Sequence, residues 1–248
     1  MLNDPAFYLA AIPAVLVFGI SKGGFGGGLG IAAVPLMALV VSPAVAAGIL
    51  LPLLLVMDAI GIWAYRRRFE RRIIQTMLPG ALVGIVMASL AFSYLNDDVI
   101  RVLLGLIASG FAADYFLRRK GDLPARPHEP RRAAFWGGVA GFTSTVAHSG
   151  GPPANIYLLP LKLDKSIFVG SMIVLFALIN AAKVLPYALL GLFTPANLWA
   201  SLALVPVAAI GMLAGIWLHD KVNQQLFYRL CYVFVLLTGL KLIHDGLT

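Results

Sequence analysis

The chain has 248 residues, of which 60% are hydrophobic and only 12% are charged, and its mean hydropathy is +0.89. Because soluble domains carry about 25% charged residues, this composition excludes an ordinary soluble protein and indicates an integral membrane protein. The net charge of +8 could suggest a nucleic-acid partner. The basic residues, however, lie in short loops between apolar runs, as the positive-inside rule expects, and we predict no such partner.

Apolar runs follow one another along the chain and predict membrane-spanning helices and shorter arms. In the first half they cover residues 6–20, 31–41, 44–64, 74–95 and 99–117, and in the second half 133–147, 154–161, 166–190, 198–218 and 226–243. An arginine- and proline-rich segment separates the two halves. We therefore predict an N-terminal repeat (1–117), a cytoplasmic linker (118–132) and a C-terminal repeat (133–248).

Two polar, glycine-rich stretches interrupt the apolar runs at membrane depth. The first is Ser21-Lys22-Gly23-Gly24-Phe25-Gly26-Gly27-Gly28-Leu29-Gly30, and the second is Ala147-His148-Ser149-Gly150-Gly151-Pro152-Pro153. The apolar flanks of each are too short to cross a bilayer comfortably, which predicts broken helices. Unwound backbone is tolerated there only when it is buried in protein or lines a wet cavity, so we expect the functional site at these breaks. The alternative is close helix packing, with Gly23 and Gly27 as a GxxxG contact.

The two halves share a residue pattern. Residues 42–65 align with 164–187 without gaps, which pairs Asp58 with Asn180 and Tyr65 with Tyr187, and Pro79, Gly84 and Asn96 pair with Pro206, Gly211 and Asn223 at one further offset. We interpret this as a duplication. Each half would hold one re-entrant hairpin and three spans, and because three is odd the halves would insert in opposite orientations. The fold class predicted is thus all-α, with two inverted repeats.

This topology places fourteen of the nineteen lysines and arginines on the cytoplasmic side, in agreement with the positive-inside rule. Both termini would then lie outside, on the periplasmic face of a bacterial inner membrane. The rival topology has eight spans in parallel repeats and puts Lys162, Lys165 and Lys221 outside. The short arms beside each break favour the hairpins.

Opposed hairpins would aim two helix N-termini at one cavity near the midplane. Such ends carry unsatisfied N–H groups and partial positive charge, so they bind anions. We expect a small anion to be bound by residues of both breaks: Ser21, Lys22, Gly23, Gly24, His148, Ser149, Gly150, Gly151 and Asn155. Pro152 and Pro153 suit the first turn of the second arm. No metal or cofactor is expected, since no metal-ligand spacing is present.

Three residues within spans are candidates for coupling or gating: Asp58, Asn180 and Lys183. Lys22 could contact the anion, or it could pair with Asp58 or with helix carbonyls, because a buried ammonium is costly unless paired. Asp58 could carry protons, partner Lys22 as a gate, or form a structural hydrogen bond. Lys183 could be a second anion contact, although snorkelling to an interface is slightly favoured.

At these residues the chain resembles the sulfite exporter TauE/SafE family of membrane transporters. The features that carry the resemblance are Gly19-Ile20-Ser21-Lys22-Gly23-Gly24-Phe25 with Gly28 and Pro35-Leu36, Asp58 followed by Tyr65-Arg66-Arg67, Ala147-His148-Ser149-Gly150-Gly151-Pro152, and Asn180. The resemblance covers essentially the whole chain. It implies export of sulfite or small organosulfonates across the bacterial inner membrane.

We therefore predict a secondary transporter of small anions that works by alternating access, with protons as a candidate coupling ion and a homodimer as one assembly that the sequence allows. Pro79, Gly84, Pro206 and Gly211 are candidate flexing points. A passive anion channel on the same fold is the main alternative. An intramembrane hydrolase that uses Ser149 and His148 is a weaker one, since adjacent residues rarely align as nucleophile and base and no acid partner is evident.

Overall fold

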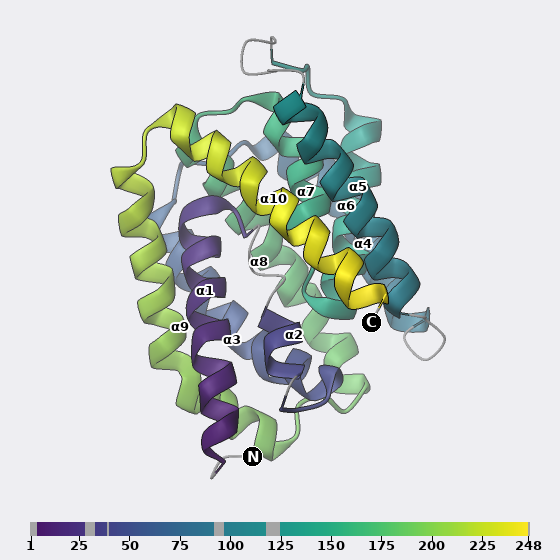
Figure 1. Cartoon of the computed structure of the whole chain (residues 1–248), viewed down its shortest axis with the longest axis vertical. Helices are drawn as coiled ribbons and strands as arrows, with labels where there is room; N and C mark the ends of the chain where they lie inside the picture. Colours follow the sequence, from purple (N-terminus) through teal and green to yellow (C-terminus); the bar gives the residue numbers. More distant parts are fainter. Residues whose placement is uncertain (1–3, 28–32, 39, 92–96, 118–124, 248) are drawn as a thin grey trace.

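The computed structural model describes residues 4–27, 33–38, 40–91, 97–117 and 125–247, and these are almost entirely helical, with no strand among them (Figure 1). The elements in chain order are α1 (Pro5–Phe25), α2 (Ala33–Ala38), α3 (Pro43–Ala64), α4 (Arg71–Ala91), α5 (Asp97–Leu117), α6 (Pro130–Ala147), α7 (Gly151–Leu158), a 3₁₀ turn (Leu159–Leu161), α8 (Lys165–Leu189), α9 (Pro195–Lys221) and α10 (Gln224–Leu247). Within the described residues, six helices are long and apolar enough to cross a membrane: α1, α3, α4, α8, α9 and most of α10. The predicted all-α membrane protein is confirmed.

Local sequence signals set several helix starts. Asp4, Ser42, Asp164 and Thr194 each precede a helix, and each side-chain oxygen accepts a hydrogen bond from a backbone N–H of the first turn. Proline follows the cap at α1, α3 and α9, where its missing N–H costs nothing. Pro152 and Pro153 likewise lie in the first turn of α7, as expected.

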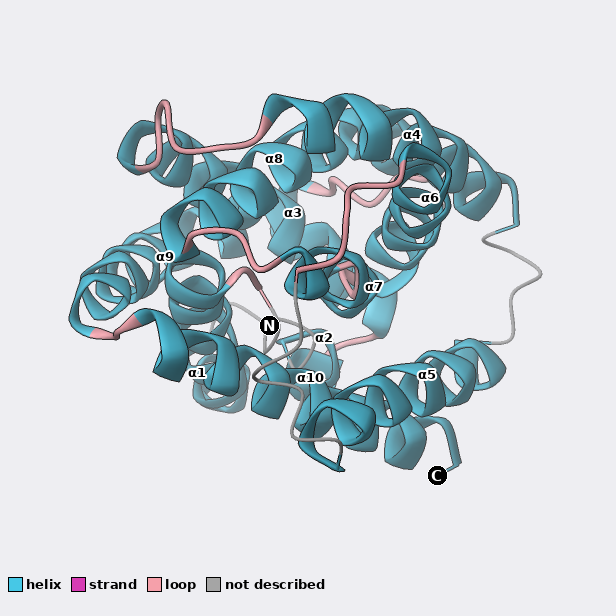
Figure 2. Cartoon of the chain, turned by 90° about the horizontal axis from the view of Figure 1, so that it is seen from above, coloured by secondary structure: helices cyan, strands magenta, loops and turns pink. Residues whose placement is uncertain are grey.

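The helices pack in pairs that are reciprocal between the two halves. α1 lies along α9, α6 lies along α4, and α5 lies along α10, while α3 and α8 sit between the first two pairs (Figure 2). Small residues make these pairs close: a Cβ on Gly141 of α6 would lie 2.1 Å from the Ala81 carbonyl oxygen of α4. On the far side of α4, large apolar side chains such as Val83 and Leu90 are exposed, as expected for a lipid-facing surface.

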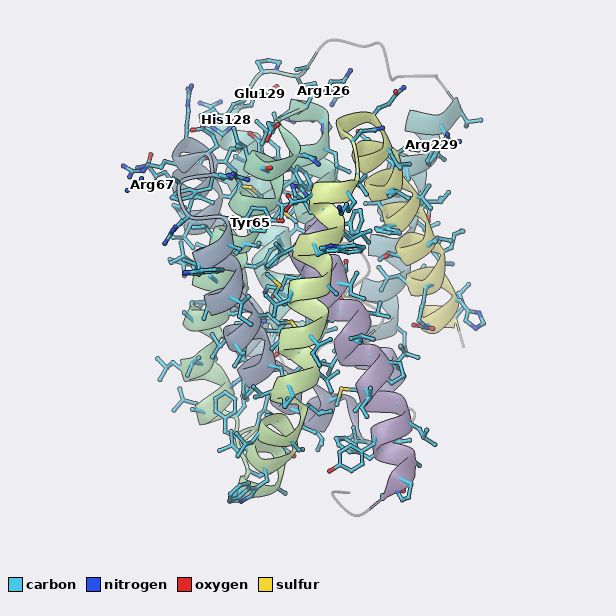
Figure 3. The ribbon with its side chains drawn as sticks, turned by 90° about the vertical axis from the view of Figure 1, so that its left-hand side faces the viewer. Tyr65, Arg67, Arg126, His128, Glu129 and Arg229 are labelled. Atoms are coloured by element: carbon cyan, nitrogen blue, oxygen red, sulfur yellow. The ribbon has the colours of Figure 1, made fainter. Side chains whose placement is uncertain are left out.

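Basic residues gather at one end of the bundle. Figure 3 shows Arg67, Arg126 and Arg229 at this end, whereas α1 starts at the opposite end. Hydrogen bonds tie the same end together across the sequence, because the N–H of Glu70 donates to Ser171 Oγ at 2.9 Å and Lys165 Nζ donates to the His219 carbonyl at 2.7 Å. The start of α8 and the end of α9 therefore lie beside the basic loop that follows α3.

The second break is the turn of a helical hairpin. The N–H of Arg126, before α6, donates to the carbonyl of Pro160, after α7, at 2.9 Å, and Tyr157 Oη contacts His128 Nδ1 at 2.7 Å. The chain thus leaves the basic end along α6, turns at residues 148–150 and returns to the same end. This observation excludes a single crossing for residues 130–161.

The first break differs from the expectation in one respect. The prediction that its leading arm is too short to span is wrong, because α1 stays helical through Ser21-Lys22-Gly23-Gly24 to Phe25. Its 21 residues make a helix of about 31 Å, long enough to cross a bilayer core. The glycines do not break the helix because α9 packs directly against them. The expected unwound residues 28–30 lie outside the described part.

Candidate functional site

Both broken helices end in the same turn. α1 is capped by Gly26 (φ 68°) and α6 is capped by His148 (φ 51°), and both cap residues are in the left-handed conformation. The N–H of Gly27 donates to the Ser21 carbonyl at 3.0 Å, and the N–H of Ser149 donates to the Thr143 carbonyl at 3.1 Å. These are matching Schellman-type caps, and each pair of equivalent residues is 122 positions apart, the offset that also relates Asp58 to Asn180.

One cavity lies between the two breaks. Its volume is about 30 Å³, which is room for about two ordered waters. Residues from both halves of the chain line it: Phe18, Lys22, Gly26, Gly27, Leu54, Ser144, His148, Gly151, Met172, Ile173, Phe176 and Asn180. Segments more than 100 residues apart thus meet around a small, largely apolar space with a few convergent polar groups, which is the usual make-up of a ligand site.

Lys22 lines this cavity and forms an ion pair with Asp58. Its Nζ lies 2.7 Å from Asp58 Oδ1, and Asn180 Nδ2 donates to Asp58 Oδ2 at 2.7 Å. All three residues are buried, with at most 6% of the residue surface exposed. The Asn180 Oδ1 atom has no hydrogen-bond partner within the described residues, and Asn180 lines the cavity. α1, α3 and α8 are therefore joined at one point by an ion pair and an amide.

Lys183 forms the second polar cluster. Its Nζ contacts the carbonyl and the hydroxyl of Ser144, each at 3.0 Å, and His148 Nδ1 at 2.9 Å. The slightly favoured prediction that Lys183 snorkels to an interface is wrong, since its side chain is fully buried. It is held inward because the end of α6 offers a carbonyl, a hydroxyl and an imidazole nitrogen as acceptors.

His148 joins this cluster to α3. Its Nε2 lies 3.1 Å from the carbonyl oxygen of Ala47, so the imidazole bridges α3 and α8 from the tip of the second break. Ser149 Oγ donates locally to the Ala147 carbonyl at 3.0 Å. Because the two imidazole nitrogens face Lys183 and Ala47, His148 is not arranged as a base for Ser149.

Three residues expected at the first tip lie elsewhere. Ser21, Gly23 and Gly24 are buried inside α1, and a Cβ on Gly23 or Gly24 would lie 2.4 or 2.6 Å from a backbone oxygen of α9. Their N–H groups belong to the helix, so the expectation that the amides of Gly23 and Gly24 face the ligand is wrong. Close packing against α9 accounts for both glycines, but the GxxxG contact considered from the sequence holds only for Gly23, since a Cβ on Gly27 would meet nothing within 4 Å.

The remaining predicted contacts belong to the second break. Gly151 lines the cavity, whereas Gly150 is packed against the Ala140 carbonyl and Phe176. Asn155 is fully buried, and neither Oδ1 nor Nδ2 has a hydrogen-bond partner within the described residues. It does not belong to the cavity lining. Among the described residues, no group of histidine, cysteine or acidic side chains is placed to hold a metal ion.

The known family that this chain matches is the sulfite exporter TauE/SafE family, over residues 11–242. The chain belongs to this family. Its members are membrane exporters of sulfite and related sulfur-containing anions rather than enzymes, which leaves the hydrolase alternative without support. No curated protein and no solved structure matches the chain.

Sequence reasoning missed several residues that hold the breaks of this TauE/SafE protein in place. Tyr65 Oη donates to the Gly23 carbonyl and Tyr187 Oη donates to the Thr145 carbonyl, both at 2.8 Å. His219 Nδ1 adds a contact at 3.1 Å to the Gly24 carbonyl. The equal offset between the two tyrosines was a usable signal, because Gly23 and Thr145 are separated by the same 122 positions.

Proposed function

We propose that this TauE/SafE protein is a secondary transporter, and an exporter, of small sulfur-containing anions such as sulfite or organosulfonates, and that the anion binds in the cavity between the two breaks. The observation that carries the proposal is the charge of that site. Lys22 lines the cavity, Asp58 is paired with Lys22, and Lys183 contacts the lining residues Ser144 and His148; all three charged residues are buried. One cationic group is left over, and an anion would balance it.

The groups around the cavity suit an oxyanion. Lys22, His148 and Asn180 all line it, and each can present N–H donors. An anion that reached Lys22 would compete with Asp58 for the ammonium, so that binding would loosen the link between α1 and α3. In this reading Asp58 is a gate partner of Lys22, one of the roles considered from the sequence.

Movement of the anion requires a second conformation. The cavity of about 30 Å³ holds about two waters, which is too little for a hydrated oxyanion. The Tyr65 hydroxyl bonds the end of α1 to α3, and the Tyr187 hydroxyl bonds the end of α6 to α8. These two hydrogen bonds are called the tyrosine ties. We propose that the two ties are released in alternation, so that the site opens to one face at a time.

An inverted repeat would explain why the two ties are equivalent. The reciprocal packing of α1 on α9 and α6 on α4, the matching caps and the common offset of 122 residues support it. With the basic end in the cytoplasm, both termini would face the periplasm. Oppositely oriented halves can exchange conformations, which is the usual basis of alternating access.

The test is counterflow in proteoliposomes that contain the purified protein. Vesicles loaded with unlabelled sulfite should transiently accumulate radiolabelled sulfite, and external isethionate or thiosulfate should compete when it shares the site. Lys22→Met should abolish counterflow, whereas Lys241→Met, which removes a lysine paired with Asp245 on α10, should not. Rapid anion flux without counterflow would identify a channel instead, and no flux of any sulfur anion would refute the proposal.

A further inference from the structure

We propose that His148 and Lys183 form the site at which a proton is taken up together with the transported anion. The anion inserts between His148 Nδ1 and Lys183 Nζ, and one proton enters as their direct contact is replaced. This inference rests on the proposed transport function, because it assigns the coupling ion of the same site.

The partners of the imidazole set its protonation in the observed state. His148 Nε2 faces the Ala47 carbonyl at 3.1 Å, and a carbonyl oxygen only accepts hydrogen bonds, so Nε2 carries a hydrogen. Nδ1 faces Lys183 Nζ at 2.9 Å. A hydrogen bond between these two nitrogens needs one hydrogen and one lone pair, so a single proton lies between them.

This arrangement limits the charge of the pair. Lys183 Nζ faces three acceptors, the carbonyl and hydroxyl oxygens of Ser144 and His148 Nδ1, which match the three donors of an ammonium, so we assign one positive charge to the pair. A second proton would give an ammonium and an imidazolium whose donors point at each other, which like-charge repulsion disfavours. An oxyanion removes that obstacle because one oxygen can accept from Nδ1–H and another from Nζ–H. The balance is complete: one contact between the nitrogens is lost, two N–H···O bonds form, and one proton comes from water on the open side.

The other charged groups near the cavity do not supply the counter-charge. In the observed state, Lys22 from α1 and Asp58 from α3 are bound to each other, and Asn180 from α8 is neutral. Tyr187 of α8 presents its ring, with the Lys183 Nζ 5.8 Å from the ring centroid. Among the described residues, no carboxylate contacts His148 or Lys183, so an incoming anion is the partner that a second proton requires.

Access and backbone conformation support the same assignment. His148 and Ser144 line the cavity, and Lys183 lies directly behind them. His148 also occupies a left-handed position (φ 51°), where glycine is the least strained residue. The equivalent residue of the first break is Gly26. The second break therefore keeps an imidazole where a residue without a side chain would fit the turn better.

The experiment is calorimetric titration of the purified protein with isethionate, whose sulfonate does not titrate near neutral pH. At one pH, the heats measured in Bis-Tris and in Tris differ by the number of protons exchanged multiplied by the difference between the two buffers' ionisation enthalpies. Neither buffer is itself an oxyanion. The wild type should take up about one proton per anion. Linkage then predicts that the affinity of the wild type for isethionate weakens about tenfold for each unit rise in pH. This holds over the pH range in which the pair binds its second proton only together with the anion.

Three variants make the result specific. His148→Gly keeps a residue suited to the left-handed turn, and it should bind isethionate with a proton uptake near zero. Asp58→Asn should keep an uptake near one whatever its affinity, and His128→Gln, in the linker, should match the wild type. In the wild type, nitrogen NMR of labelled histidine should show one Nδ1 changing from unprotonated to protonated when isethionate is added, which needs no variant to fold.

The outcomes separate this inference from the function on which it rests. Binding of isethionate without proton uptake, or an uptake lost in Asp58→Asn and kept in His148→Gly, would overturn the role of His148 and leave transport intact. An absence of binding heat for both isethionate and sulfite, together with no counterflow, would overturn the proposed function and this inference with it.

Discussion

Asp58 and Asn180 are 122 residues apart, occupy matching positions on α3 and α8, and are hydrogen-bonded to each other at 2.7 Å. In the inverted repeat proposed above, two equivalent positions that touch would lie next to the axis that relates the two halves. This placement also explains why only one of them is acidic. Two ionised carboxylates at that distance would repel, whereas an amide donates to the carboxylate. The contact therefore suits one carboxylate and one amide at these positions rather than two carboxylates.

The ion pair between Lys22 and Asp58 should be a strong determinant of stability. Lys22→Met leaves a buried carboxylate without its cation and should cost about 3–5 kcal/mol of unfolding free energy. Lys22→Met combined with Asp58→Asn removes both charges and should recover most of that loss without recovering sulfite counterflow. Denaturation in detergent and the proteoliposome assay measure the two effects. A double variant no more stable than Lys22→Met would contradict this account of the pair.

The two tyrosine ties should be energetically alike. Tyr65→Phe and Tyr187→Phe each remove one hydrogen bond to a helix-end carbonyl, and each should lower stability by about 1 kcal/mol. Each should also change the rate of counterflow, because each releases one broken helix. Tyr8→Phe, at a partly exposed position on α1, is the matched control and should have little effect. Unequal losses for Tyr65 and Tyr187 would argue against equivalent ties.

Close packing of α6 on α4 should make Gly141 intolerant of a side chain. A Cβ there would lie 2.1 Å from the Ala81 carbonyl oxygen, whereas a Cβ on Gly110 of α5 would meet nothing within 4 Å. Gly141→Ala should lower stability by about 1–3 kcal/mol through overpacking. Gly110→Ala should be neutral or stabilising by up to about 1 kcal/mol, because alanine favours helix. Thermal unfolding of both variants in the same detergent decides between these outcomes.

His128 should make stability depend on pH outside the membrane-spanning segments. Partial burial, with a smaller effect of the Arg72 charge, lowers its pKa below the ordinary value of 6.5. The unfolded chain then binds more protons than the folded chain as pH falls below 6.5, so this residue lowers stability progressively until pH passes its folded pKa. His128→Gln should reduce the loss of melting temperature between pH 7.5 and 5.5. An unchanged loss would show that other groups account for it.

The amino-acid sequence determined the broad architecture, because apolar run lengths, caps and charge bias are local properties. It predicted the helices from α3 to α10 to within a few residues and the hairpin at Ala147 to Pro153, and it aligned Asp58 with Asn180 without predicting the hydrogen bond between them. The family resemblance, also visible in the residues, is confirmed by the match over residues 11–242.

Only the tertiary structure decided which polar residues face the cavity. Gly23 and Gly24 look like an unwound tip in sequence, but α9 packs on them, so the helix continues. Lys183 looks like an interfacial lysine, but the end of α6 provides it with three buried acceptors. In both cases the deciding partner lies far away in the chain, and no local pattern records whether a neighbouring helix will cover a glycine or satisfy a charge.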